Sequence, residues 1–402
     1  MGSNPTPSAY APIVTVVALV LAVAGALLAI SIHITMPTFG LMVVRLVAAE
    51  LSAYIVMVEL VAIVIAIVAA RDVGRTAAVA IAIVGVALAA VPLAQLPGAI
   101  QSADRALTDI GAPPGDVGFS PARLFTGLDV PNVHRTNDIP FRSIGTTALK
   151  LDRYDGAGAG PHPALVVVHG GSWRNGDKGS GCLDPTATNR IFAGRGITVY
   201  DIQYRLVPEA TFPGQLEDVL CALGYIRAHA TEDGVDLERV ALLGRSAGAH
   251  LALLAAYHAG REAPPTGCGA PARVRGVISL YGPTDLATGY RMPAIPDLIG
   301  GSEAIAGFMG GSPDAVPARY AQATPQALLD RQVPPTLLIH GQADQIVQPY
   351  HSESLAAALR AARDTVALVE LPWAGHGFDG VSWGIGGQLA EVSLDLGHTP
   401  PV

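Results

Sequence analysis

The chain has little charge, and least of all near its beginning. Only 14% of its 402 residues are charged, the net charge is −8, and the lysines are Lys150 and Lys178. This composition argues against nucleic-acid binding, which needs a positive surface. The sequence has no Cys/His cluster with zinc-like spacing and no phosphate-binding loop, so we expect no metal and no cofactor.

The first hundred residues are almost entirely apolar. Charged residues there are confined to Arg45, Glu50, Glu59, Arg71, Asp72 and Arg75. The apolar stretches 11–34, 51–70 and 76–100 are each long enough to cross a bilayer, for which about 20 residues suffice. A secretory signal peptide would explain only the first stretch and would need a basic start; apolar core helices are the other alternative. We therefore predict a three-helix transmembrane domain over residues 1–100, with helices at about 11–34, 40–70 and 76–100.

Three spans would place the N-terminus and the rest of the chain on opposite sides of the membrane. Arg71 and Arg75 lie between the second and third spans, and the positive-inside rule makes that connection cytoplasmic, although Arg45 opposes this. We thus expect a multi-pass integral membrane protein with an extracytoplasmic catalytic domain.

Glu59 lies near the middle of the second span, where a carboxylate is costly. Arg45 is about 21 Å away along a straight helix and cannot pair with it. Glu59 is expected to pair with another span, to be protonated, or to mark an oligomer contact through the transmembrane helices.

The remainder of the chain has a different pattern. Residues 101–137 form a linker rich in Gly, Pro and Asp, and residues 138–402 alternate apolar strands with helices. This alternation predicts a mainly parallel sheet with helices on both faces. Segment 286–331 is longer than a simple crossover and rich in apolar residues, so it is a candidate cap over the site. The alternative is an ordinary helix with long loops.

A Gly-x-Ser-x-Gly sequence stands between an apolar strand, 240–243, and a helix, 247–259. This pattern is typical of a nucleophile elbow, in which Ser246 projects its hydroxyl from a sharp turn. The motif alone is weak in a chain with 45 glycines, and Ser246 could instead be a helix N-cap. Its value as evidence for a nucleophile depends on finding the partner residues in the right order along the chain.

Those partners occur in a consistent order. The strand 164–168 runs into His169-Gly-Gly-Ser-Trp173, the strand 336–339 precedes Asp344, and the strand 365–371 precedes His376. A serine needs a base to become nucleophilic, and we expect His376 as that base with Asp344 orienting it. The amides of Gly171, Ser172 and Ala247 are the predicted oxyanion hole.

Other residues compete for these roles. Asp285 is a rival acid and His398 is a rival base, whereas His169, His250 and His340 are expected to be structural. Trp173 is expected to bind substrate by lining the pocket, with packing as the equal alternative.

Residues 138–388 resemble the α/β-hydrolase superfamily, and within it the hormone-sensitive-lipase-like and bacterial feruloyl-esterase-like branches. The likeness is carried by His169-Gly-Gly-Ser-Trp173, Asp201-Ile-Gln-Tyr-Arg205, Phe212-Pro213 and Gly244-Arg-Ser-Ala-Gly-Ala-His250. Ser172 departs from the lipase-like HGGG pattern, and the Ser-Ala-Gly-Ala-His run also resembles kynurenine formamidases.

Together with the apolar N-terminal region, the resemblance implies a membrane-anchored serine carboxylesterase or lipase that hydrolyses carboxylic esters through an acyl-enzyme. The apolar residues of segment 286–331 and the membrane anchor suggest a lipid ester or another hydrophobic ester as a hypothesis for the substrate. An acyltransferase that uses the same acyl-enzyme, a formamidase-like amidase and a non-catalytic binding module are the alternatives.

The three cysteines are Cys182, Cys221 and Cys268. Cys182 follows the oxyanion loop and Cys268 precedes a strand, which should place them at opposite ends of the sheet. Cys221 falls on the apolar face of its helix. Since bridged cysteines need Cα atoms within about 7 Å, we predict no disulfide.

Overall fold

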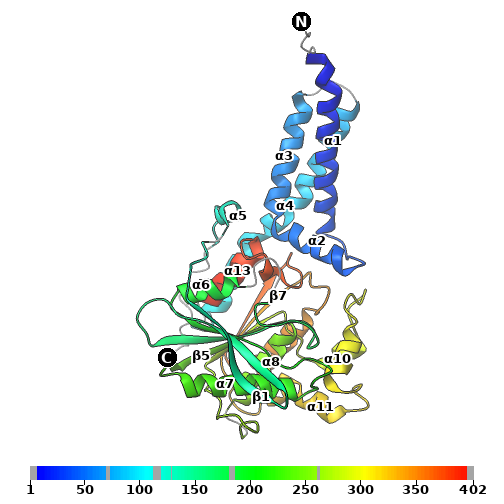
Figure 1. Ribbon diagram of the computed structural model, residues 1–402. Coiled ribbons are helices and arrows are strands. Elements are labelled where there is room, and N and C mark those ends of the chain that lie inside the picture. The colour runs from blue at the N-terminus through cyan, green and yellow to red at the C-terminus, as the bar shows by residue number, and fades with distance from the viewer. Residues whose placement is uncertain are drawn as a thin grey trace.

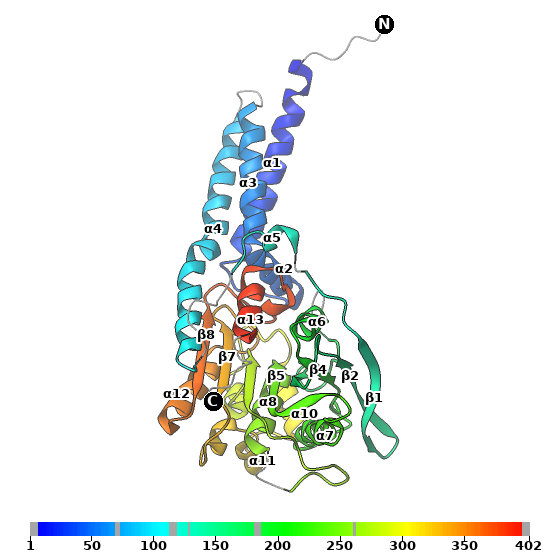
Figure 2. The same ribbon diagram turned by 90° about the vertical axis from the view of Figure 1, so that its left-hand side faces the viewer.

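The computed structural model describes residues 7–68, 73–111, 119–127, 129–180, 186–259 and 263–395. Three helices stand together on one end of an α/β domain (Figure 1): α1 (Pro7–Ser31), α3 (Ser52–Val68) and α4 (Val73–Thr108). A shorter helix, α2 (Phe39–Glu50), lies across the base of this bundle. The start of α1, the end of α3 and the start of α4 lie at the far end from the α/β domain (Figures 1 and 2).

Two of these helices, α1 over Pro12–Ser31 and α4, are long and apolar enough to cross a membrane. The second predicted helix, 40–70, is wrong as a single element, because α2 and α3 meet at a bend of 78°. The bend follows from the partners of α2. Its charged residues Arg45 and Glu50 both bind the α/β domain, which a continuous upright span could not allow.

Helix α4 also departs from the prediction. Its 36 residues correspond to about 54 Å, well beyond the roughly 30 Å of a bilayer core. Its last turns bury Ala99, Ala103 and Leu107 in the same core as the sheet. The predicted linker therefore does not begin at 101. The described part of 109–134 contains the short helix α5 (Arg123–Thr126), and residues 112–118 and 128 lie outside the described part.

The described residues form an eight-stranded sheet in the order β1-β2-β4-β3-β5-β6-β7-β8. The strands are β1 (Arg135–Ile144), β2 (Thr147–Tyr154), β3 (His162–Val168), β4 (Thr198–Ile202), β5 (Val235–Arg245), β6 (Gly276–Leu280), β7 (Thr336–Gly341) and β8 (Val366–Leu371). Strand β2 pairs antiparallel with β1 and β4, and the other pairs are parallel. The predicted fold class, a mainly parallel sheet with helices on both faces, is confirmed.

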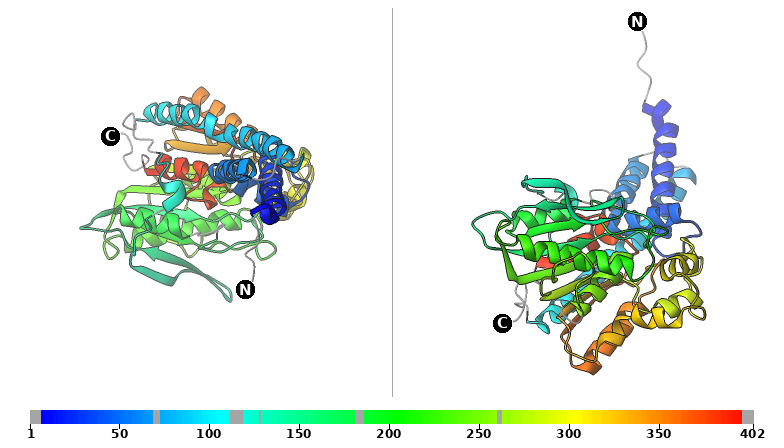
Figure 3. Two further views of the ribbon diagram at one scale, coloured as in Figure 1. Left: turned by 90° about the horizontal axis from the view of Figure 1, so that it is seen from above. Right: turned by 60° about the horizontal axis from the view of Figure 1, so that its bottom comes forward.

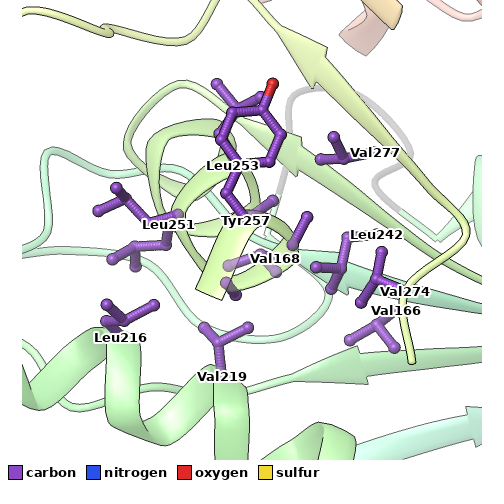
Figure 4. Packing of buried hydrophobic residues seen from close by; sticks show 14 of the residues in the cluster. Val166, Val168, Leu216, Val219, Leu242, Leu251, Leu253, Tyr257, Val274 and Val277 are labelled. Carbon is purple, nitrogen blue, oxygen red and sulfur yellow. The ribbon is translucent and has the colours of Figure 1, made fainter. Parts of the chain in front are cut away.

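Each face of the sheet has its own apolar core. On one face, α7 (Gly214–His229), α8 (Ala247–His258) and α12 (Tyr350–Ala362) cover strand residues such as Val166 and Leu242 (Figure 4). On the other face, α6 (Ala187–Gly194), α13 (Ile385–Asp395) and the end of α4 cover Leu165 and Leu243 (Figure 2). Because adjacent strand residues point to opposite faces, these continuous apolar strands fill both cores.

Segment 286–331 contains α9 (Leu286–Arg291), α10 (Gly301–Met309), α11 (Pro317–Gln322) and the 3₁₀ turn η1 (Pro325–Leu328). It forms a small group of helices on one side of the domain, and this side also holds α2 (Figure 3).

The prediction of no disulfide is wrong, because Cys221 and Cys268 are bonded, with Cα atoms 5.2 Å apart. Cys221 lies on α7, and the loop before β6 folds back along that helix. Its Ala272 amide donates to the Leu223 carbonyl, and the glycine at position 224 permits the close approach, because a Cβ there would overlap the Gly269 carbonyl. The sequence argument compared Cys182 with Cys268 and missed this return of the chain. Cys182 lies outside the described residues.

Candidate active site

Ser246 sits on a sharp turn between β5 and α8. Its φ is 54°, a left-handed value that non-glycine residues rarely adopt. A Cβ at Gly244 would overlap Gly248 and Ala249, and one at Gly248 would overlap the carbonyl oxygens of Val168 and His169. The two glycines of the motif are therefore required by close packing, as expected for a nucleophile elbow.

His376 and Asp344 lie in line with this serine. His376 Nε2 is 2.9 Å from Ser246 Oγ, and His376 Nδ1 is 2.7 Å from Asp344 Oδ2. With its Nδ1 proton donated to Asp344, the imidazole leaves Nε2 to accept the serine hydroxyl proton. The structure thus brings together the three residues that were predicted from separate segments of the chain.

Asp344 is buried but well supplied with hydrogen-bond donors. Its Oδ1 accepts the amides of Ile346 and Val347 at 2.8 and 3.0 Å. Burial alone would raise its pKa, but His376 and His340 outweigh burial and hold the pKa of this carboxyl well below its usual range. The carboxylate therefore stays ionised and can stabilise a charged His376 imidazole.

The loop after β3 lies directly against the elbow. A Cβ at Gly170 would come within 3.2 Å of Ser246 Cβ. The loop continues through three residues with positive φ: Gly171 (118°), Ser172 (55°) and Trp173 (58°). In the described part of the chain, no carbonyl accepts the amide of Ser172. The Ala247 amide begins α8, so it has no preceding helical carbonyl to bind.

A pocket of roughly 580 Å³, open mouth included, adjoins Ser246. Of the predicted site residues, Ser172, Trp173 and Ala247 line it, and Gly171 lies one residue back in the loop. Cap residues form the opposite wall: Gly289, Met292, Pro293, Ala294, Asp297, Ile299, Gly301, Ala304 and Ile305. The third wall is Ile346, Val347 and Gln348, from the loop that carries Asp344. Most of these side chains are apolar, which suits a hydrocarbon group.

Trp173 fits both of its predicted roles. It lines the pocket, yet it is buried and stacks on Phe308 of α10 with ring centroids 4.4 Å apart. Its edge also meets His250, 5.5 Å away. The tryptophan therefore joins the oxyanion loop to the cap.

The competing residues have structural partners. Asp285 caps α9 by accepting the Thr288 amide at 2.9 Å. His250 Nε2 donates to the Ala323 carbonyl, and His169 Nδ1 binds the Gly170 carbonyl. Burial lowers the pKa of each of these two histidines to about 4, so both stay neutral. His340 binds Ser352 and Val347. His398 lies outside the described residues.

One supporting network was not predicted. Arg245, next to the nucleophile, pairs with Asp379, and Asp379 accepts the Tyr281 hydroxyl. The Tyr281 ring then contacts His376, with centroids 4.5 Å apart. The network fixes the His376 loop against the elbow. The sequence did contain one signal for this network: Arg245 lies inside the nucleophile motif, and an arginine at such a buried position needs an acidic partner.

Within the described residues, no group of three His, Cys, Asp or Glu side chains is arranged to hold a metal ion. The pocket next to Ser246 is lined mainly by apolar side chains, His376 lies behind the serine, and the amides of Ser172 and Ala247 lie at the pocket wall. Such an arrangement can activate Ser246 and stabilise an oxyanion next to it.

Comparison with known proteins agrees with this geometry. The family model BD-FAE matches residues 151–359. Esterase LipQ of Mycobacterium tuberculosis is 32% identical over 282 residues, covering 66% of this chain and 64% of LipQ. Esterase LipC of the same organism is 31% identical over 225 residues, 54% of each protein. The chain thus spans about half to two thirds of these relatives.

Among solved structures, esterase B from Lactobacillus rhamnosis has a TM-score of 0.52 at 21% identity, covering 73% of this chain and 89% of that one. This likeness supports the α/β-hydrolase fold.

Proposed function

The chain belongs to the BD-FAE family, and we propose that it is a membrane-anchored serine hydrolase of carboxylic esters. The observation that carries the proposal is the hydrogen-bonded series Ser246–His376–Asp344 beside an apolar pocket. The names of its relatives, Esterase LipQ and Esterase LipC, support an ester rather than an amide as substrate.

In the proposed reaction, Ser246 Oγ attacks the ester carbonyl carbon while His376 Nε2 takes the hydroxyl proton. The carbonyl oxygen becomes an oxyanion, which the amides of Gly171, Ser172 and Ala247 stabilise. His376 then gives its proton to the leaving alcohol, and an acyl-enzyme remains. A water molecule attacks this acyl group, His376 takes a proton from it, and the carboxylic acid and free Ser246 are released.

We also propose three membrane crossings, through α1, α3 and the first part of α4, with the hydrolase domain outside the cytoplasm. The apolar surfaces of these helices support the crossings. The Cys221–Cys268 bond supports the location, since disulfides persist in oxidising compartments. Peptide mass spectrometry after alkylation without reduction is expected to find these cysteines linked. Free thiols at both would argue for a cytoplasmic domain.

The test of the activity is hydrolysis of p-nitrophenyl butyrate by the full chain in detergent micelles. Removing a serine nucleophile typically lowers kcat by about 10⁴-fold or more, and we expect that loss for Ser246→Ala. Ser354→Ala, the same change on α12, is the matched control and should retain activity. Hydrolysis by the Ser246→Ala protein at the wild-type rate would refute the proposed nucleophile.

A further inference from the structure

The mouth of the pocket is unusual for the hydrolase domain, because its rim is apolar and exposed. Within the described residues 129–390, the large apolar side chains that solvent reaches freely are Met292 and Ile295, at 64% and 91% exposure. Both belong to the loop between α9 and α10. Met292 and its neighbours Pro293 and Ala294 also line the pocket, so the exposed apolar surface is continuous with the pocket wall.

A second apolar surface lies on α2. Its outer side exposes Phe39, Leu41, Val43 and Val44, at 38–51%, and carries no charge. The charged residues of this helix turn to the hydrolase domain instead, Arg45 to the Ala343 carbonyl at 2.7 Å and Glu50 to the Gly386 amide at 2.6 Å. A helix with this distribution, perpendicular to a membrane bundle, is suited to lie in the bilayer surface.

The α2 surface is fastened to the loop that carries Asp344. Gln345 follows Asp344 and precedes the pocket residue Ile346. Its side chain binds both the amide and the carbonyl of Met36, at 3.2 and 3.3 Å, in the turn before α2. The cap lies on the same side of the molecule as α2 (Figures 1 and 3). The pocket therefore opens next to the base of the bundle.

From this arrangement we infer that the substrate is an ester with a long apolar chain, taken from the bilayer leaflet beside α2. The inference rests on the proposed function and adds the substrate class and the route. The chain of the ester passes over Met292 and Ile295 into the apolar pocket, and its carbonyl reaches Ser246. Contact with lipid removes the apolar side chains of the rim and of α2 from water. Their exposure to water would otherwise cost free energy in proportion to their exposed apolar area.

The test compares two esters with one leaving group: p-nitrophenyl acetate in water and p-nitrophenyl palmitate in phosphatidylcholine nanodiscs that hold the full chain. The variant Ile295→Gln, at the exposed rim residue that does not line the pocket, should lose about tenfold in apparent kcat/KM on the palmitate, since the side chain contributes its apolar burial. Its rate on the acetate should change less than about twofold. Phe125→Gln is the matched control, because Phe125 is 51% exposed on α5, on the opposite side of the bundle base; it should leave both rates unchanged.

The outcomes separate the two claims. If the wild-type protein cleaves the acetate through Ser246 but not the palmitate, the substrate class is wrong and the proposed function stands. If the Ile295→Gln variant loses both activities equally, the rim serves the catalytic site and not the lipid, which also overturns the inference. If neither ester is cleaved, the proposed function itself fails.

Discussion

The bundle and the hydrolase domain bury opposite kinds of side chain. Between α1, α3 and α4, the fully buried residues of two small clusters are alanines, at positions 18, 22, 62, 66, 78 and 82, with partly buried leucine, isoleucine and valine packed against them. The larger Val16, Val20, Leu27 and Val64 face outward at 58–63% exposure. The hydrolase domain instead encloses rings such as Tyr154, Phe192 and Tyr257. Small residues between helices and large ones outside are typical of a lipid environment, where helices associate by close packing and not by the hydrophobic effect.

The two regions also treat a buried carboxyl differently. Asp344 accepts three hydrogen bonds and has His340 Nε2 3.4 Å away. Glu59 instead lies between Gly25 and Gly85, and neither of its oxygens has a hydrogen-bond partner in the described structure. The Asp344 site is built for an ion, and the Glu59 site is a space left by two glycines. The following predictions test this contrast, in order of expected effect.

The largest effect is expected from neutralising the carboxyl of Asp344. Asp344→Asn should lower kcat by about 10⁴-fold, because an amide no longer holds His376 in the tautomer that accepts the serine proton. Since the pKa of Asp344 is well below its usual range, this loss should be the same from weakly acidic to weakly basic pH. Glu59→Gln, the matched change in the bundle, should alter kcat by less than about twofold. The measurement is kcat of both variants on a water-soluble ester. Similar losses of kcat in both variants would contradict the proposed difference between the Asp344 and Glu59 sites.

The disulfide should dominate the stability of the hydrolase domain. It closes a loop of 47 residues, and loop-closure entropy for that length corresponds to about 4 kcal/mol. The double change Cys221→Ser with Cys268→Ser should therefore lower the free energy of unfolding by up to about that amount, as measured by denaturant unfolding in detergent. The control is Cys182→Ser, the same change at the third cysteine. An unchanged unfolding midpoint in the double variant would contradict the prediction.

The bundle should be most sensitive at the glycines around Glu59. A Cβ at Gly85 would overlap the Glu59 carboxyl, so Gly85→Ala should destabilise the bundle by about 1–3 kcal/mol through overpacking. Gly98 lies on the same helix with nothing within 4 Å of a Cβ, so Gly98→Ala should be neutral or stabilising by up to about 1 kcal/mol. Thermal unfolding in detergent compares the pair, and equal shifts would count against a tightly packed Glu59 site.

The smallest effect concerns the joint between the regions. Arg45 donates to Ala343 and Gln345, the residues that flank Asp344. Losing hydrogen bonds of a charged group costs about 1.5–3 kcal/mol. Only part of this free energy should appear as a higher activation barrier, because Arg45 acts through the loop that carries Asp344. We therefore expect Arg45→Gln to lower kcat up to about tenfold with little change in KM. The control is Arg105→Gln, an exposed arginine near the end of α4. A variant at Arg45 that keeps full kcat would mean that the anchor and the acid loop act independently.

The sequence was most informative where function depends on local order. Ser246, Asp344 and His376 each follow an apolar strand, and parallel strands bring their carboxyl ends to one edge of a sheet. Strand and helix positions therefore sufficed to predict that these residues meet. The mainly parallel sheet was predictable for the same reason.

The features that were missed depend on contacts distant in the chain. The bend at Leu51 is set by what Arg45 and Glu50 bind some 300 residues later. Helix α4 continues past Pro92 and Pro97 to Thr108 because its last turns share a core with the sheet. The disulfide depends on a loop that returns along α7. Apolar periodicity contains no information on any of these pairings.

The most direct test of the account is labelling of the membrane-bound full chain with a fluorophosphonate, followed by peptide mass spectrometry. A fluorophosphonate reacts with a serine that an adjacent base has activated. We predict one adduct, on Ser246, that is lost in His376→Ala. An adduct on another serine, or no adduct on the folded wild-type protein, would contradict the claim that Ser246 is the nucleophile.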